Sequence, residues 1–206
     1  MDKTVRTIES YNRCASRFNE IYYDNGVYQD FIQNFSDFLT EGAAILDLGC
    51  GPGNVSKFLS RQGKGYKIIG VDLSITMLEI AKRNVPGQLF MVEDIRHLEF
   101  KQQFDGIIAS FSIIHLDTGE TFKLLEDCFN LLKDGGYLYI SFMADGCSGF
   151  ETTNFSDKEI YFNYLVPEEV IAVLEKTGYC IVEKHFRSYY RTAERVVRDV
   201  IIIAKK

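Results

Sequence analysis

The stretch Ile45–Asn54 reads Ile-Leu-Asp-Leu-Gly-Cys-Gly-Pro-Gly-Asn, an apolar run that leads into three closely spaced glycines. Such a run is typical of a buried strand, and a helical pattern follows at residues 55–61. Gly49, Gly51 and Gly53 can adopt positive φ and let the backbone approach a ligand closely. Their spacing is GxGxG, not the GxGxxG of pyrophosphate-binding loops. The stretch therefore predicts a strand, a ligand-binding loop and a helix.

Outward from this loop, short apolar runs alternate with helical patterns. We expect strands near residues 44–48, 67–71, 88–92, 104–109 and 136–142, with helices between most of them. This alternation is typical of parallel βαβ units. Two further strand patterns, at 179–186 and 196–204, leave no room for a crossover helix and should pair antiparallel.

The residues before the first strand are expected to be helical, at 7–18 and around 27–39. We predict one α/β domain over residues 1–206, with a helical cap at 1–42 and a doubly wound, Rossmann-like core at 43–206. No repeat, low-complexity tract or linker divides the chain.

Composition excludes several classes of protein. The chain of 206 residues is 46% hydrophobic and carries a net charge of −6, so it can bury a core but has no basic patch for nucleic acid. It lacks a stretch of the roughly 18 to 20 apolar residues that cross a membrane, and it begins without a signal-peptide core, so we expect a cytoplasmic protein. Its five cysteines form no CxxC pair, which argues against disulfides and a zinc site, and no metal is expected.

Asp72 ends the second predicted strand, nineteen residues after Gly53. A carboxylate there can accept hydrogen bonds from both hydroxyls of a ribose, although Asp72 could instead cap the helix after Ser74. Together with the GxGxG loop, this residue makes the chain resemble the class I S-adenosylmethionine-dependent methyltransferases, in particular the small-molecule members of types 11 and 25.

Three further segments carry the resemblance, which extends from Tyr11 to the last strand. An acidic residue follows the third strand in Val92-Glu-Asp-Ile95, and residues 104–110 and 131–138 resemble the segments around the fourth and fifth strands. The resemblance implies seven strands in the order 3-2-1-4-5-7-6, with strand 7 antiparallel. It also implies S-adenosylmethionine as cofactor.

The cofactor-binding residues that this reading predicts come from the loop and the strand ends. They are Tyr11, Asp47, Gly49, Cys50, Gly51, Gly53, Asp72, Leu73, Met77, Asp94, Ile95 and Ser110. The resemblance implies that Asp94 meets the adenine amino group with Ile95 beside the ring, and that Tyr11 closes over the cofactor. Four of them have a plainer alternative: Asp47 could only fix the loop, Met77 could pack in the core, Asp94 could form a turn, and Tyr11 could pack its helix.

The substrate side is less specific. His115 lies just beyond the fourth strand, where open α/β sheets bind ligands, and could be a general base, a pocket wall or a structural residue. The aromatic-rich connection at 144–166 predicts a lid over the substrate, with Phe150, Tyr161 and Tyr164 as candidate contacts, or else a flap that only packs on the core. Arg187 and Arg191, in an expected turn at 185–194, could bind a carboxylate or be paired in solvent.

The function predicted from these features is methyl transfer from S-adenosylmethionine to an O, N or C nucleophile of a small molecule. The alternatives are a nicotinamide-dependent oxidoreductase, a non-catalytic cofactor-binding module, or methylation of protein or nucleic acid. The [ND]PP[YF] motif of amino-methylating enzymes is absent, since Ser110-Phe-Ser-Ile113 stands in its place. The sequence therefore disfavours a nucleic-acid partner, no membrane partner is expected, and the chain should be a monomer or homodimer.

Overall fold

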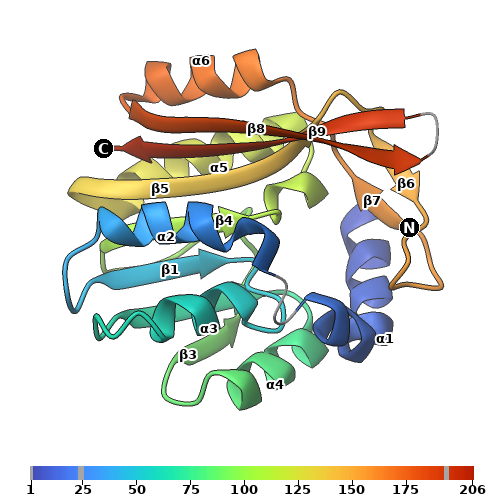
Figure 1. The fold of residues 1–206 in the computed structure, drawn as a ribbon, viewed down its shortest axis with the longest axis horizontal. Helices are drawn as coiled ribbons and strands as arrows, with labels where there is room; N and C mark the ends of the chain where they lie inside the picture. Colours follow the sequence, from blue (N-terminus) through green and yellow to red (C-terminus); the bar gives the residue numbers. More distant parts are fainter. Residues whose placement is uncertain (1, 23–25, 193–194) are drawn as a thin grey trace.

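A seven-stranded mixed sheet forms the centre of the computed structural model, which describes residues 2–22, 26–192 and 195–206, with the backbone alone at 190–192 and 195. The strand order is β3-β2-β1-β4-β5-β9-β8 (Figure 1). β1 pairs in parallel with β2 and β4, whereas β9 pairs antiparallel with both β5 and β8. The predicted order 3-2-1-4-5-7-6 is confirmed, because β9 and β8 are the seventh and sixth strands of this sheet.

The first four strands of the chain follow the apolar runs closely, whereas the strands expected at 136–142 and 179–186 are longer than predicted. They are β1 (Ala44–Leu48), β2 (Lys67–Asp72), β3 (Leu89–Val92), β4 (Phe104–Ser110), β5 (Leu132–Ala144), β8 (Cys180–Thr192) and β9 (Arg195–Lys205). The helices are α1 (Lys3–Tyr22), α2 (Gln29–Asp37), α3 (Asn54–Ser60), α4 (Ile75–Asn84), α5 (Thr118–Leu131) and α6 (Pro167–Thr177), with 3-10 turns η1 (Gly26–Tyr28) and η2 (Ile113–His115). None of the helices in these described ranges is both long and apolar enough to cross a lipid bilayer.

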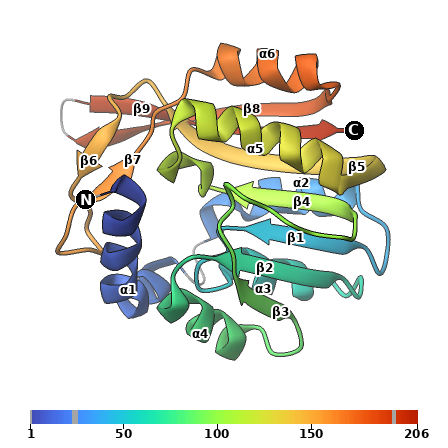
Figure 2. The same ribbon diagram turned by 180° about the vertical axis from the view of Figure 1, so that it is seen from behind.

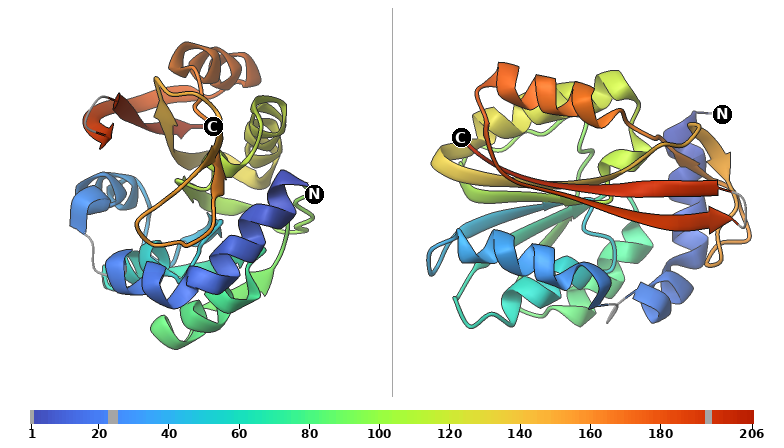
Figure 3. Two further views of the ribbon diagram at one scale, coloured as in Figure 1. Left: turned by 90° about the vertical axis from the view of Figure 1, so that its right-hand side faces the viewer. Right: turned by 45° about the horizontal axis from the view of Figure 1, so that its top comes forward.

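Helices cover both faces of the sheet and make three layers (Figure 3). α2 and α3 lie on one face, in front of the sheet in Figure 1, and α5 and α6 lie on the other, which Figure 2 turns toward the viewer. Side chains alternate between the two faces along each strand: Ile107 packs with the α5 and α6 side, whereas Ile108 packs with the α2 and α3 side.

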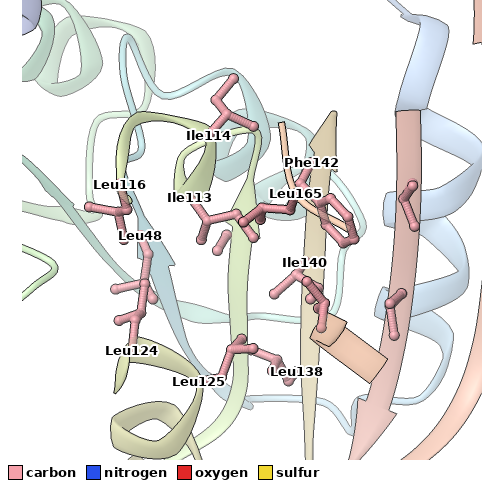
Figure 4. Close-up of a cluster of buried hydrophobic side chains, with 14 of the residues drawn as sticks. Leu48, Ile113, Ile114, Leu116, Leu124, Leu125, Leu138, Ile140, Phe142 and Leu165 are labelled. Atoms are coloured by element: carbon pink, nitrogen blue, oxygen red, sulfur yellow. The ribbon is translucent and has the colours of Figure 1, made fainter. Parts of the chain in front are cut away.

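The larger apolar cluster lies between the sheet and the helices α5 and α6 (Figure 4). Its members from β1, β5, α5 and residues 113–116 include Leu48, Ile113, Ile114, Leu116, Leu124, Leu125, Leu138, Ile140 and Phe142. Burial of this apolar surface is what holds η2 and the end of β4 in place. The loop after β4 is therefore built on a packed layer.

Local signals set the ends of several helices. Ser74 accepts a hydrogen bond from the backbone of Met77 and is the N-cap of α4, so Asp72 is not the cap. Asp117 and Glu120 form a capping box at the start of α5, and Gly178 ends α6 in the left-handed conformation.

One expectation about the second half of the chain was wrong. Residues 185–192 continue β8 instead of forming a turn, because aromatic residues such as Phe186 and Tyr189 pair with Val200 and Val197 across the hairpin. The connection at 144–166, which was expected to be a lid or a flap, contains a two-stranded ribbon of β6 (Gly149–Glu151) and β7 (Ile160–Phe162).

The N-terminal helix α1 is longer than the predicted 7–18 and lies across the edge of the sheet to which β1 points (Figure 1). It packs against α4 and β7. The Ser74 hydroxyl donates to Oδ1 of Asn12 at 2.7 Å, and the Ser10 hydroxyl donates to the carbonyl of Glu159 at 3.1 Å. The helix therefore forms one wall over the carboxyl ends of the strands.

Candidate functional site

The glycine loop between β1 and α3 is held in a left-handed conformation, with φ of 64°, 52° and 82° at Gly49, Gly51 and Gly53. A Cβ at Gly49 would lie 2.4 Å from Cβ of Ser112, so only glycine fits between the loop and the segment after β4. A Cβ at Gly51 would meet nothing within 4 Å. Gly49 and Gly51 line a cavity under α1, which we call the first cavity.

Gly53 and the Cys50 side chain, from the same loop, pack against α4 and β3. Gly53 packs closely on Ala81 of α4, where an added Cβ would lie 3.2 Å from the Ala81 Cβ. The Cys50 thiol is buried in a cluster with Leu78 and Phe90, and burial raises its pKa well above the ordinary value. The thiol is therefore protonated at neutral pH, and Cys50 is not among the described residues that line the first cavity.

Asp47 lies beneath the loop and is 1% exposed. The Ser56 hydroxyl, in the first turn of α3, donates to Oδ2 of Asp47 at 2.6 Å. Burial raises the pKa of Asp47 to about 7. This geometry favours the alternative in which Asp47 fixes the glycine loop to the helix that follows it.

Asp72 forms the neighbouring part of the wall of the first cavity. Its Oδ2 accepts from the backbone N–H of Gly51 at 2.9 Å, and its Oδ1 accepts from that of Ser74 at 2.8 Å. Each carboxylate oxygen has a second lone pair, so the group can still accept hydrogen bonds from a ligand. Burial raises the pKa of Asp72.

Asp94 and Ile95 follow β3 and also line the first cavity, together with Leu73 and Met77. Arg96, which the sequence analysis did not single out, donates to Asp94 at distances from 2.6 to 3.0 Å. Burial would raise the pKa of Asp94, but the hydrogen bonds from Arg96 outweigh it and hold the pKa below its ordinary value. The only sequence signal for this pair was an acid and a base two positions apart.

Arg96 also connects this corner to α1 and α5. It donates to Thr4 and to Glu120, both at 3.2 Å, and Lys3 donates to Glu120 at 2.7 Å. The polar network joins three elements around the mouth of the first cavity.

Tyr11 of α1 and His115 both line the first cavity and contact each other. The Tyr11 hydroxyl lies 3.0 Å from Nε2 of His115, and Nδ1 of His115 lies 2.8 Å from the carbonyl oxygen of Tyr161. A carbonyl can only accept, so Nδ1 carries the proton and Tyr11 donates to Nε2. Burial lowers the pKa of His115 to about 4, so the ring is neutral at pH 7.

A second cavity adjoins the first, and Tyr11 and Phe18 line both. Ser110, predicted as a cofactor residue, lines the second cavity and not the first. Its neighbour Phe111 has φ of 51°, a conformation that non-glycine residues seldom adopt and that is found most often at functional sites. The backbone of Phe111 is held by Ser141, whose hydroxyl accepts from its N–H at 2.9 Å.

The predicted substrate residues lie elsewhere. Phe150 stacks against Arg6, with the guanidinium carbon 3.8 Å from the ring centre, and the Tyr161 ring lies 5.8 Å from the Lys3 ammonium. Tyr164 is buried and donates to Glu151 at 3.0 Å. None of the three is among the described residues that line the two cavities, and these roles stay predictions.

Two other aromatic residues of the same connection, Phe155 and Phe162, do line the second cavity. The aromatic content of residues 144–166 pointed to this segment, but not to which rings face inward. Arg187 is exposed on β8 and donates to the carbonyl of Val27 at 3.3 Å. The side chain of Arg191 lies outside the described residues, so its predicted role has no structural counterpart here.

Sequence comparison agrees with this geometry. A profile described as a methyltransferase domain matches residues 45–136. The putative methyltransferase YqeM of Bacillus subtilis is 29% identical over 163 residues, which are 75% of this chain and 65% of that protein. A trans-aconitate 2-methyltransferase of Escherichia coli is 32% identical over 124 residues, which are 60% of this chain and 47% of that protein. The chain thus spans between 47% and 65% of the length of these two relatives.

Among solved structures, magnesium protoporphyrin IX methyltransferase from Synechocystis, crystallised with bound S-adenosylmethionine, has the same fold. The TM-score is 0.74, the sequence identity 19%, and the match covers 100% of this chain and 98% of that one. The sheet order, the glycine loop and the matched profile agree, so residues 45–136 form a methyltransferase domain, and the chain has the fold of the S-adenosylmethionine-dependent methyltransferases.

Proposed function

We propose that this chain transfers a methyl group from S-adenosylmethionine to a small-molecule acceptor and releases S-adenosylhomocysteine. The observation that carries the proposal is the pair of adjoining cavities that share Tyr11 and Phe18. A transfer reaction needs two ligands held end to end, and rigid positioning of this kind supplies much of the rate enhancement.

The residues of the first cavity fit the cofactor. The open space beside Gly51 admits close approach to the backbone, and the Asp72 carboxylate lies next to it. Leu73, Met77 and Ile95 supply apolar walls for a planar base, with Asp94 at the same end. When bound, S-adenosylmethionine supplies a methyl group that its positively charged sulfur already activates.

In this proposal the side chains bind, orient and exclude water. Asp72 accepts the ribose hydroxyls, and Asp94, held by Arg96, accepts the adenine amino group. Tyr11 and Phe18 of α1 cover the junction of the cavities, where their aromatic faces attract positive charge. Closing this junction to water strengthens the electrostatic interactions inside it.

We assign His115 a positioning role instead of that of a general base. Its Nε2 accepts from Tyr11 and its Nδ1 donates to the Tyr161 carbonyl, so both nitrogens are engaged. A group whose conjugate acid has a pKa of about 4 is also a weak base at neutral pH. His115 thereby sets the rotamer of the ring that covers the junction.

The acceptor is proposed to be a small molecule because the second cavity is a pocket lined by side chains from α1, α2, β4 and the 144–166 connection. The net charge of −6 does not favour a nucleic-acid target. A non-catalytic cofactor-binding module would contain the same first cavity, so turnover is the measurement that separates the two.

The test has two stages. Calorimetric titration with S-adenosylmethionine, S-adenosylhomocysteine and a nicotinamide dinucleotide should show binding of the first two compounds only. Incubation with a library of small metabolites should then yield S-adenosylhomocysteine with some of them and with neither DNA, RNA nor protein. Preference for the nicotinamide compound would overturn the proposal at the first stage, and turnover on macromolecules alone would overturn it at the second.

A further inference from the structure

More than half of the described residues that line the second cavity carry aromatic rings. Phe155 of the 144–166 connection lies among three rings of α1. They are those of Tyr11, Phe18 and Tyr22, whose centres lie 6.1, 5.1 and 5.8 Å from the centre of the Phe155 ring. Tyr28 and Phe111 form a separate pair, with ring centres 4.8 Å apart. Rings therefore reach the cavity from the cap, from the 144–166 connection and from the end of β4.

The rings around Phe155 meet mostly edge to face. The Phe18 ring lies at 81° to that of Tyr11 and at 87° to that of Phe155, and the Tyr22 ring lies at 84° to that of Phe155. An aromatic ring has a negative face and a positive edge, so edge-to-face contacts are more favourable than two faces in direct register. A further aromatic ring can extend this pattern, whereas a saturated ring lacks the charge distribution on which the pattern depends.

Phe111 presents its ring to the cavity from a strained backbone. Its φ of 51° is a conformation that bulky residues seldom adopt. Its N–H donates to both the hydroxyl and the carbonyl of Ser141, at 2.9 and 3.2 Å, which fixes the segment after β4. Strain of this kind is concentrated where side chains contact ligands. The strained residue is thus one of the rings in the wall of the cavity.

The second cavity has room for one substituted ring. Its volume is about 230 Å³. An engineered apolar cavity of roughly 150 Å³ is large enough to bind benzene. The remaining space can hold the substituents of such a ring.

We infer that the methyl acceptor carries an aromatic ring, which binds in the second cavity against Phe155 and Phe111. The inference rests on the proposed function and adds the chemical class of the acceptor. Burial of apolar surface favours any apolar group in this cavity. Edge and face contacts with the surrounding rings favour an aromatic group in particular.

Two probes, 2-phenylethanol and 2-cyclohexylethanol, test the class. They have the same non-hydrogen atoms and the same hydroxyl group, but the saturated ring is the more hydrophobic of the two. A cavity that selects by apolar burial alone would therefore prefer 2-cyclohexylethanol. Each probe is titrated into the protein saturated with S-adenosylhomocysteine, and the shifts of protein NMR signals report binding.

We expect 2-phenylethanol to bind at least about threefold more tightly than 2-cyclohexylethanol, because of its contacts with the aromatic wall. Equal affinities, a preference for 2-cyclohexylethanol, or no detectable binding of 2-phenylethanol would overturn the inference.

Two variants assign the preference to individual rings. Phe155→Leu and Phe111→Leu each keep an apolar side chain and remove a ring from the wall, so each should reduce the preference for 2-phenylethanol. Phe129→Leu is the matched control and should leave the preference unchanged. Phe129 packs on Tyr179 and is not among the described residues that line either cavity.

Circular dichroism verifies that each variant is folded, and the comparison of the two probes in the unaltered protein does not depend on any variant. An unchanged preference in both Phe155→Leu and Phe111→Leu would refute the assignment of the acceptor ring to these two side chains.

The outcomes separate this inference from the proposed function. If neither S-adenosylmethionine nor S-adenosylhomocysteine binds the unaltered protein, the proposed function fails. If both bind but 2-cyclohexylethanol binds as tightly as 2-phenylethanol, the proposed function stands and the aromatic class of the acceptor is refuted.

Discussion

The hydroxyl of Tyr11 lies 3.0 Å from Nε2 of His115, although the two residues are 104 positions apart in the sequence. The contact joins α1 to the segment after β4, and thus joins the cap to the edge of the sheet where the cavities lie. The Tyr161 carbonyl fixes the other side of the imidazole. A ring held in this way should remain neutral over a wide pH range.

The first prediction concerns the pH dependence of stability. His115 has a folded-state pKa of about 4 against 6.5 for the ordinary side chain, because burial disfavours its charged form. Its contribution to the free energy of unfolding is therefore fully present above pH 6.5 and is lost as the pH falls toward 4. The loss should be on the order of 3 kcal/mol.

Urea denaturation at a series of pH values measures this loss. His115→Gln should reduce the difference in unfolding free energy between pH 7 and pH 4, because the titrating group is gone. His97→Gln, at an exposed histidine, is the control for a substitution of the same kind. An identical pH profile for the unaltered protein and His115→Gln would show that His115 does not titrate as described.

The second prediction concerns Asp72. Replacing it with alanine removes the carboxylate beside Gly51 and should weaken S-adenosylmethionine and S-adenosylhomocysteine binding by about ten- to a hundredfold, the cost of losing a charged acceptor. Calorimetric titration measures both affinities. Asp134→Ala serves as the control, since Asp134 is fully exposed. Retention of full affinity in Asp72→Ala would remove Asp72 from the cofactor site.

The third prediction compares two glycines that both have a positive φ. Gly51 and Gly63 have φ of 52° and 71°, and a Cβ at either would meet nothing within 4 Å. Alanine at each should therefore cost roughly 1 to 2 kcal/mol of stability for its left-handed backbone. Only Gly51 lines the first cavity, so only Gly51→Ala should weaken cofactor binding. Equal loss of affinity in both variants would mean that backbone strain, and not the cavity, is responsible.

The fourth prediction concerns Asp47. Burial raises its folded-state pKa from 3.8 to about 7, so its contribution to stability is present below pH 3.8 and is lost as the pH rises through 7. Asp47→Asn removes the charge, and should be more stable than the unaltered protein at pH 8 by up to about 4 kcal/mol. The gain should shrink at pH 5.

Thermal or urea unfolding at the two pH values checks this result. Ser56→Ala is the companion variant, because it removes the hydroxyl that donates to Asp47 and should deepen the loss at pH 8. If Asp47→Asn is less stable than the unaltered protein at both pH values, the ionised carboxylate stabilises the loop and the assigned direction of the pKa shift is wrong.

Much of the fold could be predicted because its signals are local. The apolar runs at 44–48 and 104–109 have the length of strands, and Ser74 and Pro167 mark helix starts. The three glycines of the loop indicate a backbone with positive φ. The direction of β9 could be predicted from the chain connectivity. Too few residues separate the last two strands for a crossover helix, so β9 has to run antiparallel to β8.

Some residues of the candidate site could likewise be predicted from local sequence signals, and others could not. Gly49, Gly51 and Asp72 were found from sequence because a ligand-binding loop needs these residue types at fixed short separations. The aromatic rings that line the second cavity were not found from sequence. Whether Phe155 or Phe150 faces this cavity depends on how the β6–β7 ribbon packs on α1.

What only the tertiary structure decided is which polar groups are buried together. The short-range patterns of the sequence predicted the strands and the glycine loop, and the family resemblance that these patterns carry implied the strand order and the cofactor. The pairing of Tyr28 with Asp199, 171 positions apart, depends on how far β9 extends between β5 and β8. Burial and the electrostatic environment arise from all the elements that surround a side chain, and no local pattern encodes that sum.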